Sequence, residues 1–413
     1  MTFQTLNLLE GIQKAIKEID YTIPTPIQEQ AIPLLLAGND ICGSAQTGTG
    51  KTAAFAIPIL QQIAIKRDKN KKFPSIQALI LAPTRELAMQ IYEQFLLYGK
   101  YLSLKVAVIF GGVPQRSQTA ILQNGVDILI ATPGRLIDLY NQRFVKLFDV
   151  KHFVLDEADR MLDMGFIHDV KKIIGYLPEK KQTMLFSATI SSEIEALISS
   201  LLKNPTRLAI TPVEEPLDLI RQELYYVEKK DKINLLKDLL ADKSIQSALV
   251  FTRTKHGANR LAQDLTAYGV PCEAIHGNKS QSARERALSL FKAKKIRILV
   301  ATDIAARGLD INELSHVINY DLTDIPETYI HRIGRTGRAG QTGVSISFCS
   351  QEEKDQLKDI QKHMKMEIPV FTHPKHTVSF LPVNMEATPK AAVAFHSQRR
   401  TSGKRPGAYR GHR

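Results

Sequence analysis

The sequence lacks several features that would place it in a specialised class. Tryptophan is absent, and the three cysteines, Cys42, Cys272 and Cys349, lie far apart without CxxC or Cys/His spacing. A disulfide framework and a cysteine-based zinc site are therefore not expected. No run of about 18 apolar residues is present to span a bilayer. The N-terminus lacks the cationic start and apolar core of a signal peptide, which predicts a cytoplasmic location.

Length and composition are those of an ordinary folded protein. Of the 413 residues, 44% are hydrophobic and 23% are charged, a balance typical of a chain with a sizeable core. Because domains usually span roughly 100 to 200 residues, this length predicts two lobes.

The charge is unevenly distributed. A net charge of +13 favours a polyanionic partner, either nucleic acid or an anionic membrane surface. After Glu386 no acidic residue remains, whereas seven cations follow: Lys390, Arg399, Arg400, Lys404, Arg405, Arg410 and Arg413. This segment lacks the amphipathic period of an interfacial helix, so no membrane partner is expected. The composition of residues 374–413 predicts a basic, mostly disordered tail.

Short apolar runs alternate with helix-length amphipathic stretches in both halves of the chain. This rhythm predicts an α/β fold with parallel sheets. Proline and acidic residues interrupt it at ITPVEEPLDLI, which predicts a linker at 209–217 between domains at 1–208 and 218–373. The predicted strands lie in IQALILAP, KVAVIFGG, VDILIATP, HFVLDEAD, QTMLFSAT, SALVFTRT, VPCEAIHG, IRILVATD, HVINYDLT and GVSISFCS.

The segment AQTGTGKT, residues 45–52, has the order of a phosphate-binding loop. It follows the strand-like NDICGS and precedes a helical stretch. Its glycines would let backbone amides approach phosphates, with Lys51 reaching the β- and γ-phosphates and the Thr52 hydroxyl binding Mg²⁺. A glycine-rich turn without a ligand is the alternative. The candidate ATP-binding residues here are Ala45, Gln46, Thr47, Gly48, Thr49, Gly50, Lys51 and Thr52.

Two further motifs carry charge suited to phosphate chemistry. An apolar strand in HFVLDEAD delivers Asp156 and Glu157 to its carboxyl end, where ligands bind in such sheets. Asp156 can hold Mg²⁺, and Glu157 can orient or deprotonate the water that attacks the γ-phosphate; an acidic helix N-terminus is the alternative. In HRIGRTGR, residues 331–338, three arginines at three-residue spacing suit convergence on a phosphate, although a solvated charged surface would look similar.

The order of motifs from Phe3 to about Ser350 resembles the DEAD-box branch of superfamily 2 helicases. The resemblance implies two tandem RecA-like domains and an ATP-hydrolysing RNA helicase that unwinds short duplexes locally. The strings DEADRMLDMGF and QTMLFSAT resemble the bacterial RhlE-like subgroup. The matching motifs are Phe3, YTIPTPIQ, AQTGTGKT, PTRELA, GG at 111–112, TPGR, DEAD, SAT, ATDIAARGLDI and HRIGRTGR.

The resemblance implies roles for individual residues around ATP. Tyr21 would stack on adenine, Gln28 would read its edge, and Asp310 would contact the ribose. Ser187 and Thr189 would couple the ATP state to strand separation. The second lobe would complete the catalytic site with His331 and the arginine fingers Arg335 and Arg338.

The resemblance also implies that RNA is bound across both lobes. Hydroxyls, backbone amides and arginines would contact the backbone, so binding would be largely independent of base sequence. Ribosomal particles and RNA-decay assemblies are the candidate larger partners. A DNA translocase and an ATP-gated RNA clamp without turnover remain the alternative functions. The candidate RNA-binding residues are Thr84, Arg85, Gly112, Thr132, Arg135, Arg253, Gly277 and Thr302.

Overall fold

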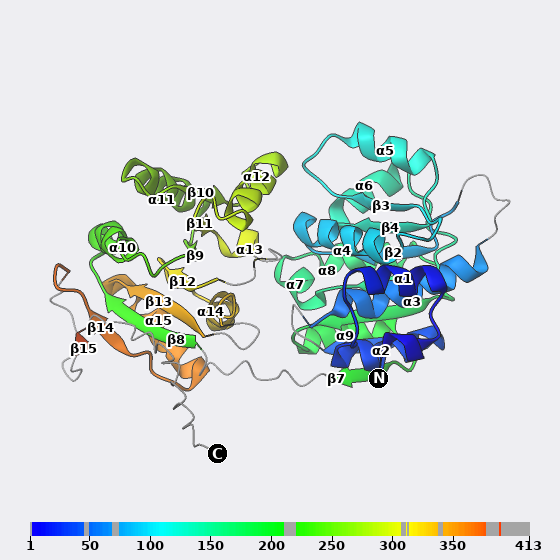
Figure 1. Cartoon of the computed structure of the whole chain (residues 1–413), viewed down its shortest axis with the longest axis horizontal. Helices are drawn as coiled ribbons and strands as arrows, with labels where there is room; N and C mark the ends of the chain where they lie inside the picture. The colour runs from blue at the N-terminus through cyan, green and yellow to red at the C-terminus, as the bar shows by residue number, and fades with distance from the viewer. Residues whose placement is uncertain are drawn as a thin grey trace, which may run out of the picture.

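The computed structural model describes residues 2–44, 49–67, 74–209, 220–306, 311, 314–337 and 342–376, and the backbone of 388–389. These residues form two lobes side by side, each a parallel sheet flanked by helices (Figure 1). The predicted α/β fold of two tandem RecA-like domains is confirmed. Among the described residues, no helix is both long and apolar enough to cross a bilayer.

The first lobe is built on seven parallel strands in the order β3-β4-β2-β5-β6-β1-β7. Strand β1 lies between β6 and β7, where Ile41 pairs with Met184 on one side and Thr206 on the other. The strands are β1 (Ile41–Ser44), β2 (Ala78–Leu81), β3 (Val106–Ile109), β4 (Ile128–Ala131), β5 (His152–Leu155), β6 (Gln182–Ser187) and β7 (Thr206–Ala209).

Helices cover both faces of this sheet, so β2, β4, β5 and β6 are buried at every position, and β2 and β4 are apolar throughout. Successive strand residues point to opposite faces: Ile80 joins one buried cluster and Leu79 the other. On one face Phe55 packs against Phe95 and Phe186. The helical segments are η1 (Phe3–Leu6), α1 (Glu10–Glu18), α2 (Pro26–Leu36), α3 (Lys51–Lys66), α4 (Arg85–Tyr98), α5 (Gln115–Gln123), α6 (Pro133–Asn141), α7 (Ala158–Asp163), α8 (Ile167–Ile174) and α9 (Ser192–Leu201).

The second lobe has eight parallel strands in the order β10-β11-β9-β12-β13-β8-β14-β15. Its strands are β8 (Ile220–Tyr226), β9 (Ala248–Phe251), β10 (Cys272–Ile275), β11 (Ile298–Ala301), β12 (His316–Asn319), β13 (Gly343–Cys349), β14 (Val370–Thr372) and β15 (Thr388–Pro389). Its helical segments are η3 (Lys229–Asp231), α10 (Lys232–Leu240), α11 (Lys255–Ala267), α12 (Gln281–Lys292), α13 (Asp303–Ala306), α14 (Pro326–Ile333), η4 (Gln351–Glu353) and α15 (Lys354–Met364).

All ten strands predicted from apolar runs are present, as β2 to β6 and β9 to β13. Strands β7, β8 and β14 were not predicted, and β8 begins at Ile220, the last residue of the interrupted segment ITPVEEPLDLI. Of the predicted linker, residue 209 ends β7 and 210–217 lie outside the described residues. Of the predicted tail, residues 374–376 complete a turn and Thr388–Pro389 form β15, whereas 377–387 and 390–413 lie outside them. The domain boundaries stay predictions.

Candidate nucleotide and RNA sites

Because every strand of the first sheet is parallel, its carboxyl ends bring the predicted nucleotide residues to one edge. Lys51 is the first residue of α3, the helix that comes after β1 in the chain, and Asp156 follows β5. Burial raises the pKa of the Asp156 carboxyl, whereas the positive charge of Lys51 lowers it. A buried carboxylate and the neighbouring Thr52 hydroxyl are oxygen donors of the kind that Mg²⁺ prefers, so these residues fit that ion.

The backbone of Glu157 has a conformation that residues other than glycine rarely adopt. Its φ of 53° and ψ of 55° place it in the left-handed region at the N-cap of α7. Such backbone strain is found where surrounding structure holds a functional group in place. Its amide donates to Asp156 Oδ1 at 3.0 Å, and its carboxylate contacts the Arg160 guanidinium. The DEAD turn therefore fixes both carboxylates.

Asp159, the last residue of DEAD, joins this turn to the SAT motif. Its Oδ2 accepts hydrogen bonds from the amides of Ala188 and Thr189 at 3.1 and 3.0 Å and from the Thr189 hydroxyl at 3.3 Å. In return, the Ser187 hydroxyl accepts from the Asp159 amide at 3.2 Å. Sequence reasoning named Ser187 and Thr189 but assigned no role to Asp159, although it lies within the quoted motif.

Gln28 is fully buried, and both ends of its amide contact protein. Its Oε1 accepts from the Thr25 amide at 3.0 Å, and its Nε2 donates to the Gly50 carbonyl at 3.1 Å. Gly50 has a φ of 89°, and a Cβ atom there would lie 2.3 Å from Gln28 Nε2. Gln28 thus contacts Gly50 at the start of α3, while its amide keeps one N–H and one lone pair for a ligand.

Tyr21 offers a partly exposed ring near the start of α2. Its exposed fraction is 41%, and it stacks on buried Phe3 with ring centroids 6.1 Å apart. An adenine ring could stack on the remaining face. Other predicted ATP residues lie outside the described residues: Ala45, Gln46, Thr47, Gly48, Asp310 and Arg338.

The second lobe corrects one part of the arginine interpretation. Arg332 does not project toward a phosphate, because its guanidinium is buried and binds the Asp303 carboxylate through two bonds of 2.6 and 2.8 Å. It also donates to Asn319 Oδ1 and to the Asp321 carbonyl. Arg332 is an anchor between the end of β11, the end of β12 and α14.

Two candidate catalytic residues of this motif, His331 and Arg335, are described by the structure and differ in exposure. His331 is exposed on α14, whereas Arg335 is nearly buried. The cleft around Arg335 is lined by residues of the second lobe alone, among them Ser247, Ser315 and Thr336. No first-lobe residue lines this cleft, so a contact between Arg335 and a phosphate on the first lobe requires Arg335 to move relative to that lobe.

Most predicted RNA-binding residues meet in one cleft of about 470 Å³, here called the cross-lobe cleft. Five of the eight line it, and Gly112 adjoins its lining residue Gly111. Gly112 has a φ of 74°, which favours glycine, and a Cβ atom there would lie 2.2 Å from both terminal nitrogens of Arg85 and would displace that guanidinium. The residues lining the cleft are Pro83, Thr84, Arg85, Glu86, Gly111, Thr132, Gly134, Arg135, Asp138, Met164, Phe166, Gly277 and Arg284.

Besides Gly112, two predicted RNA residues do not line the cross-lobe cleft. Thr302 follows β11, and Arg253 follows β9. The Arg253 guanidinium donates to the Leu322 carbonyl at 3.2 Å and lies 3.6 Å from Glu353 Oε1. In this structure Arg253 is thus held within its own lobe.

An ion pair that sequence reasoning missed crosses the same cleft. Arg284 on α12 lies 2.7 Å from Glu86 on α4, with the two side chains 11% and 7% exposed. The atoms do not align as a hydrogen bond, so the contact is electrostatic. Burial, followed by the charge of Arg284, lowers the pKa of Arg85. The one available signal was an arginine at a buried position of an amphipathic helix.

The chain is similar to known protein families over both lobes. Residues 25–197 match the DEAD/DEAH box helicase model, and residues 231–340 match the Helicase conserved C-terminal domain model. Together these matches cover more than half of the chain.

Curated relatives and solved structures agree with these matches. The ATP-dependent RNA helicase CshA of Limosilactobacillus reuteri is 44% identical over 364 residues, 88% of this chain and 72% of that protein. The DEAD-box ATP-dependent RNA helicase CshA of Bacillus subtilis is 42% identical over 374 residues, 91% and 74% of the two chains. S. cerevisiae Dbp5 bound to RNA and ADP BeF3 has a TM-score of 0.76 at 34% identity, covering 88% and 93%.

Proposed function

The chain belongs to the DEAD/DEAH box helicase family, and from that membership we propose how its two lobes share ATP and RNA. It is an ATP-dependent RNA helicase that hydrolyses ATP. The observation that carries the proposal is the cross-lobe cleft, where Thr84, Arg85 and Arg135 of the first lobe face Gly277 and Arg284 of the second.

Each candidate nucleotide residue of the first lobe has one proposed role. Lys51 binds the β- and γ-phosphates, and Asp156 with Thr52 would hold Mg²⁺, which supplies positive charge at the phosphates when bound. Glu157 accepts the proton of the attacking water, and its contact with Arg160 keeps the carboxylate aimed. Tyr21 and Gln28 recognise adenine.

The second lobe contributes Asp310 to the ribose and His331, Arg335 and Arg338 to the γ-phosphate region when the lobes close. The Arg332–Asp303 pair supports this assignment, because it fixes the helix that precedes Arg335. Guanidinium groups delivered only in the closed form stabilise the charge that develops during hydrolysis.

RNA binds across the lobes through its backbone. Thr84 and Thr132 offer hydroxyls, Arg85, Arg135 and Arg253 offer guanidinium groups, and the remaining contacts come from Gly112, Gly277 and Thr302. Contacts to phosphate and sugar carry little sequence information, and 2′-hydroxyl contacts favour RNA over DNA. Because ATP and RNA both favour the closed form, each strengthens binding of the other by the same factor.

Finer assignments rest on the sequence alone. Membership of the RhlE-like subgroup stays a prediction, since the curated relatives compared above are named CshA. A cytoplasmic location and partners among ribosomal particles or RNA-decay assemblies are likewise predictions from motifs and charge.

The proposal is tested by measuring ATP turnover with single-stranded RNA and with DNA of the same sequence, alongside unwinding of a short RNA duplex. RNA is expected to stimulate turnover and DNA to stimulate it weakly. Equal stimulation by DNA would support a translocase on DNA. RNA binding without turnover would support the ATP-gated clamp.

A further inference from the structure

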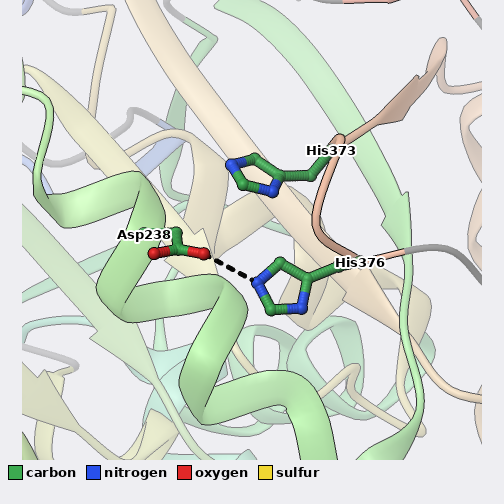
Figure 2. Close-up of side chains that lie close together, drawn as sticks. All are labelled: Asp238, His373 and His376. Carbon is green, nitrogen blue, oxygen red and sulfur yellow. Dashed lines mark hydrogen bonds and ion pairs between the residues drawn. The ribbon is translucent and has the colours of Figure 1, made fainter.

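Two histidines and an aspartate meet on the second lobe, away from the residues assigned to ATP and RNA. The chain leaves β14 and turns over His373–His376, where the His376 amide donates to the His373 carbonyl at 2.9 Å. This turn places the two imidazole rings on one side, with centroids 5.1 Å apart. Asp238 reaches them from α10, as Figure 2 shows.

The three side chains have the spacing of metal ligands. His376 Nε2 lies 2.9 Å from Asp238 Oδ2, and one ligand atom from each residue lies within 4.8 Å of the others. Around a tetrahedral Zn²⁺ with bonds of about 2.0 to 2.1 Å, neighbouring ligand atoms are about 3.4 Å apart. Small side-chain rotations would bring the three atoms to that separation.

We propose that Asp238, His373 and His376 form a binding site for a divalent transition metal of the Zn²⁺ class. Two imidazoles and one carboxylate are a ligand set that such ions use, and three protein ligands leave a coordination position for water or a further ligand. The carboxylate neutralises one of the two positive charges. The site would tie the turn after β14 to α10, at the point where the chain enters its basic C-terminal segment.

A simple ion pair explains less of this arrangement. His376 and Lys375 both contact Asp238, and the hydrogen bond from His376 lowers the pKa of the Asp238 carboxyl, which keeps it charged. Ion pairs account for His376 and Lys375, whereas the turn also brings a ring nitrogen of His373 within 4.8 Å of the Asp238 carboxylate. Within the turn, His373 Nδ1 accepts a hydrogen bond from the Lys375 amide at 3.4 Å, so the proposed site would replace that bond if Nδ1 is the ligand atom. The Lys375 side chain is 72% exposed, so its ammonium can move away when a metal cation arrives.

Metal binding is measured on untagged full-length protein stripped with a chelator and titrated with Zn²⁺ in a calorimeter, and with Co²⁺ by visible absorption. We expect one tight equivalent, weakened at least tenfold by Asp238→Asn, His373→Ala or His376→Ala. His363→Ala is the matched control, because His363 lies on α15 outside the cluster. Wild-type affinity in all three cluster variants, or no tight equivalent in the wild type, would overturn the site.

Thermal unfolding provides a second readout that does not depend on activity. A ligand that binds only the folded state raises the unfolding temperature, so Zn²⁺ should raise it for the wild type and His363→Ala. The cluster variants should show no such rise. Far-UV circular dichroism and RNA-stimulated ATP turnover without added Zn²⁺ should match the wild type, since the three residues lie outside the machinery assigned above. An equal rise in the cluster variants would contradict the site.

Discussion

Arg284 Nε lies 2.7 Å from Glu86 Oε1, so α12 of the second lobe touches the first turn of α4 within the cross-lobe cleft. Both side chains are nearly buried, and Arg85 lies beside them. A carboxylate in this position neutralises cations that an RNA phosphate would otherwise meet. The pair joins the two lobes in this structure, and in the RNA complex proposed above an RNA phosphate would compete with Glu86 for the same guanidinium group.

Glu86→Gln is expected to tighten single-stranded RNA binding. Removing one negative charge beside Arg85 and Arg284 is worth about 1 kcal/mol, or roughly fivefold in affinity. Titration of labelled RNA at several salt concentrations measures it. Glu179→Gln, an equal charge change at a side chain 93% exposed, is the control. An affinity no tighter than that of the control would mean that Glu86 does not compete with RNA for the neighbouring arginines.

Glu157→Gln is expected to bind ATP and RNA normally while its turnover falls by about 10²- to 10⁴-fold, because the general base is lost. The variant should be a long-lived clamp on RNA. Lys51→Ala should instead lose ATP turnover through a lost phosphate contact. Single-turnover hydrolysis and nucleotide titration separate the two effects. Turnover of Glu157→Gln at the wild-type rate would mean that another group activates water.

Gln28→Ala is expected to raise the KM for ATP by about tenfold or more and the KM for GTP by less, since only adenine presents the edge that the amide would read. Loss of the bond to the Gly50 carbonyl should weaken both nucleotides to some degree. Gln61→Ala is a matched control, because Gln61 is buried and bonds Leu9 and Asn7 instead. Equal losses for both nucleotides would restrict Gln28 to holding the loop.

The first lobe is expected to lose stability in mild acid through His152. Burial lowers the pKa of His152 from 6.5 to about 4, and its Nδ1 pairs with Gln182 Oε1 at 3.1 Å. As the pH falls, His152 therefore becomes protonated in the unfolded chain before it does so in the folded protein. The stabilisation is complete above pH 6.5 and is lost as the pH falls toward 4. The slope reaches about 1.4 kcal/mol per pH unit.

Calorimetric unfolding of wild type and His152→Asn between pH 7 and 4.5 measures this effect. The variant cannot titrate at this position, so its unfolding temperature should change less with pH. His168→Asn, at an exposed position, is the control and should follow the wild type. Parallel curves for wild type and His152→Asn would place the acid sensitivity elsewhere.

Removal of residues 387–413 is expected to weaken RNA binding and flatten its salt dependence while RNA-saturated ATP turnover stays almost unchanged. Seven cations follow Glu386, and each phosphate neutralised on a single strand contributes about 0.7 to the slope of log affinity against log salt. A full-length variant with these cations replaced by glutamine separates charge from length. Superimposable slopes for truncated and intact protein would mean that the tail does not bind RNA.

The fold was largely predictable because buried parallel strands read as short apolar runs. Strand β8 escaped because charged Arg221 and Glu223 interrupt its sequence, and its place beside β13 depends on residues more than 100 positions away. Short-range patterns carry no information on such pairings.

The candidate sites were predictable only where the site residues belong to recognisable sequence motifs. The structure gathers Thr84, Arg85 and Arg135 in one cleft, as the motifs predict. Arg332 was grouped with phosphate-binding arginines because the sequence does not show that Asp303 lies within reach. For the pair of Glu86 and Arg284 the sequence offers only an arginine at a buried position of an amphipathic helix, which does not identify its partner. Long-range charge pairing appears only once the chain is folded.

The position of β1 has a consequence for synthesis of the chain. This strand carries the phosphate loop, yet its hydrogen-bonded neighbours are β6 and β7, and 143 residues separate Ile41 from its partner Met184. At about 5 to 20 residues per second, a ribosome needs roughly 10 to 30 s to supply that partner. During this interval β1 has neither of its neighbouring strands. The strand that precedes the proposed phosphate loop is thus made early but cannot complete its pairing until nearly all of the first lobe has been synthesised.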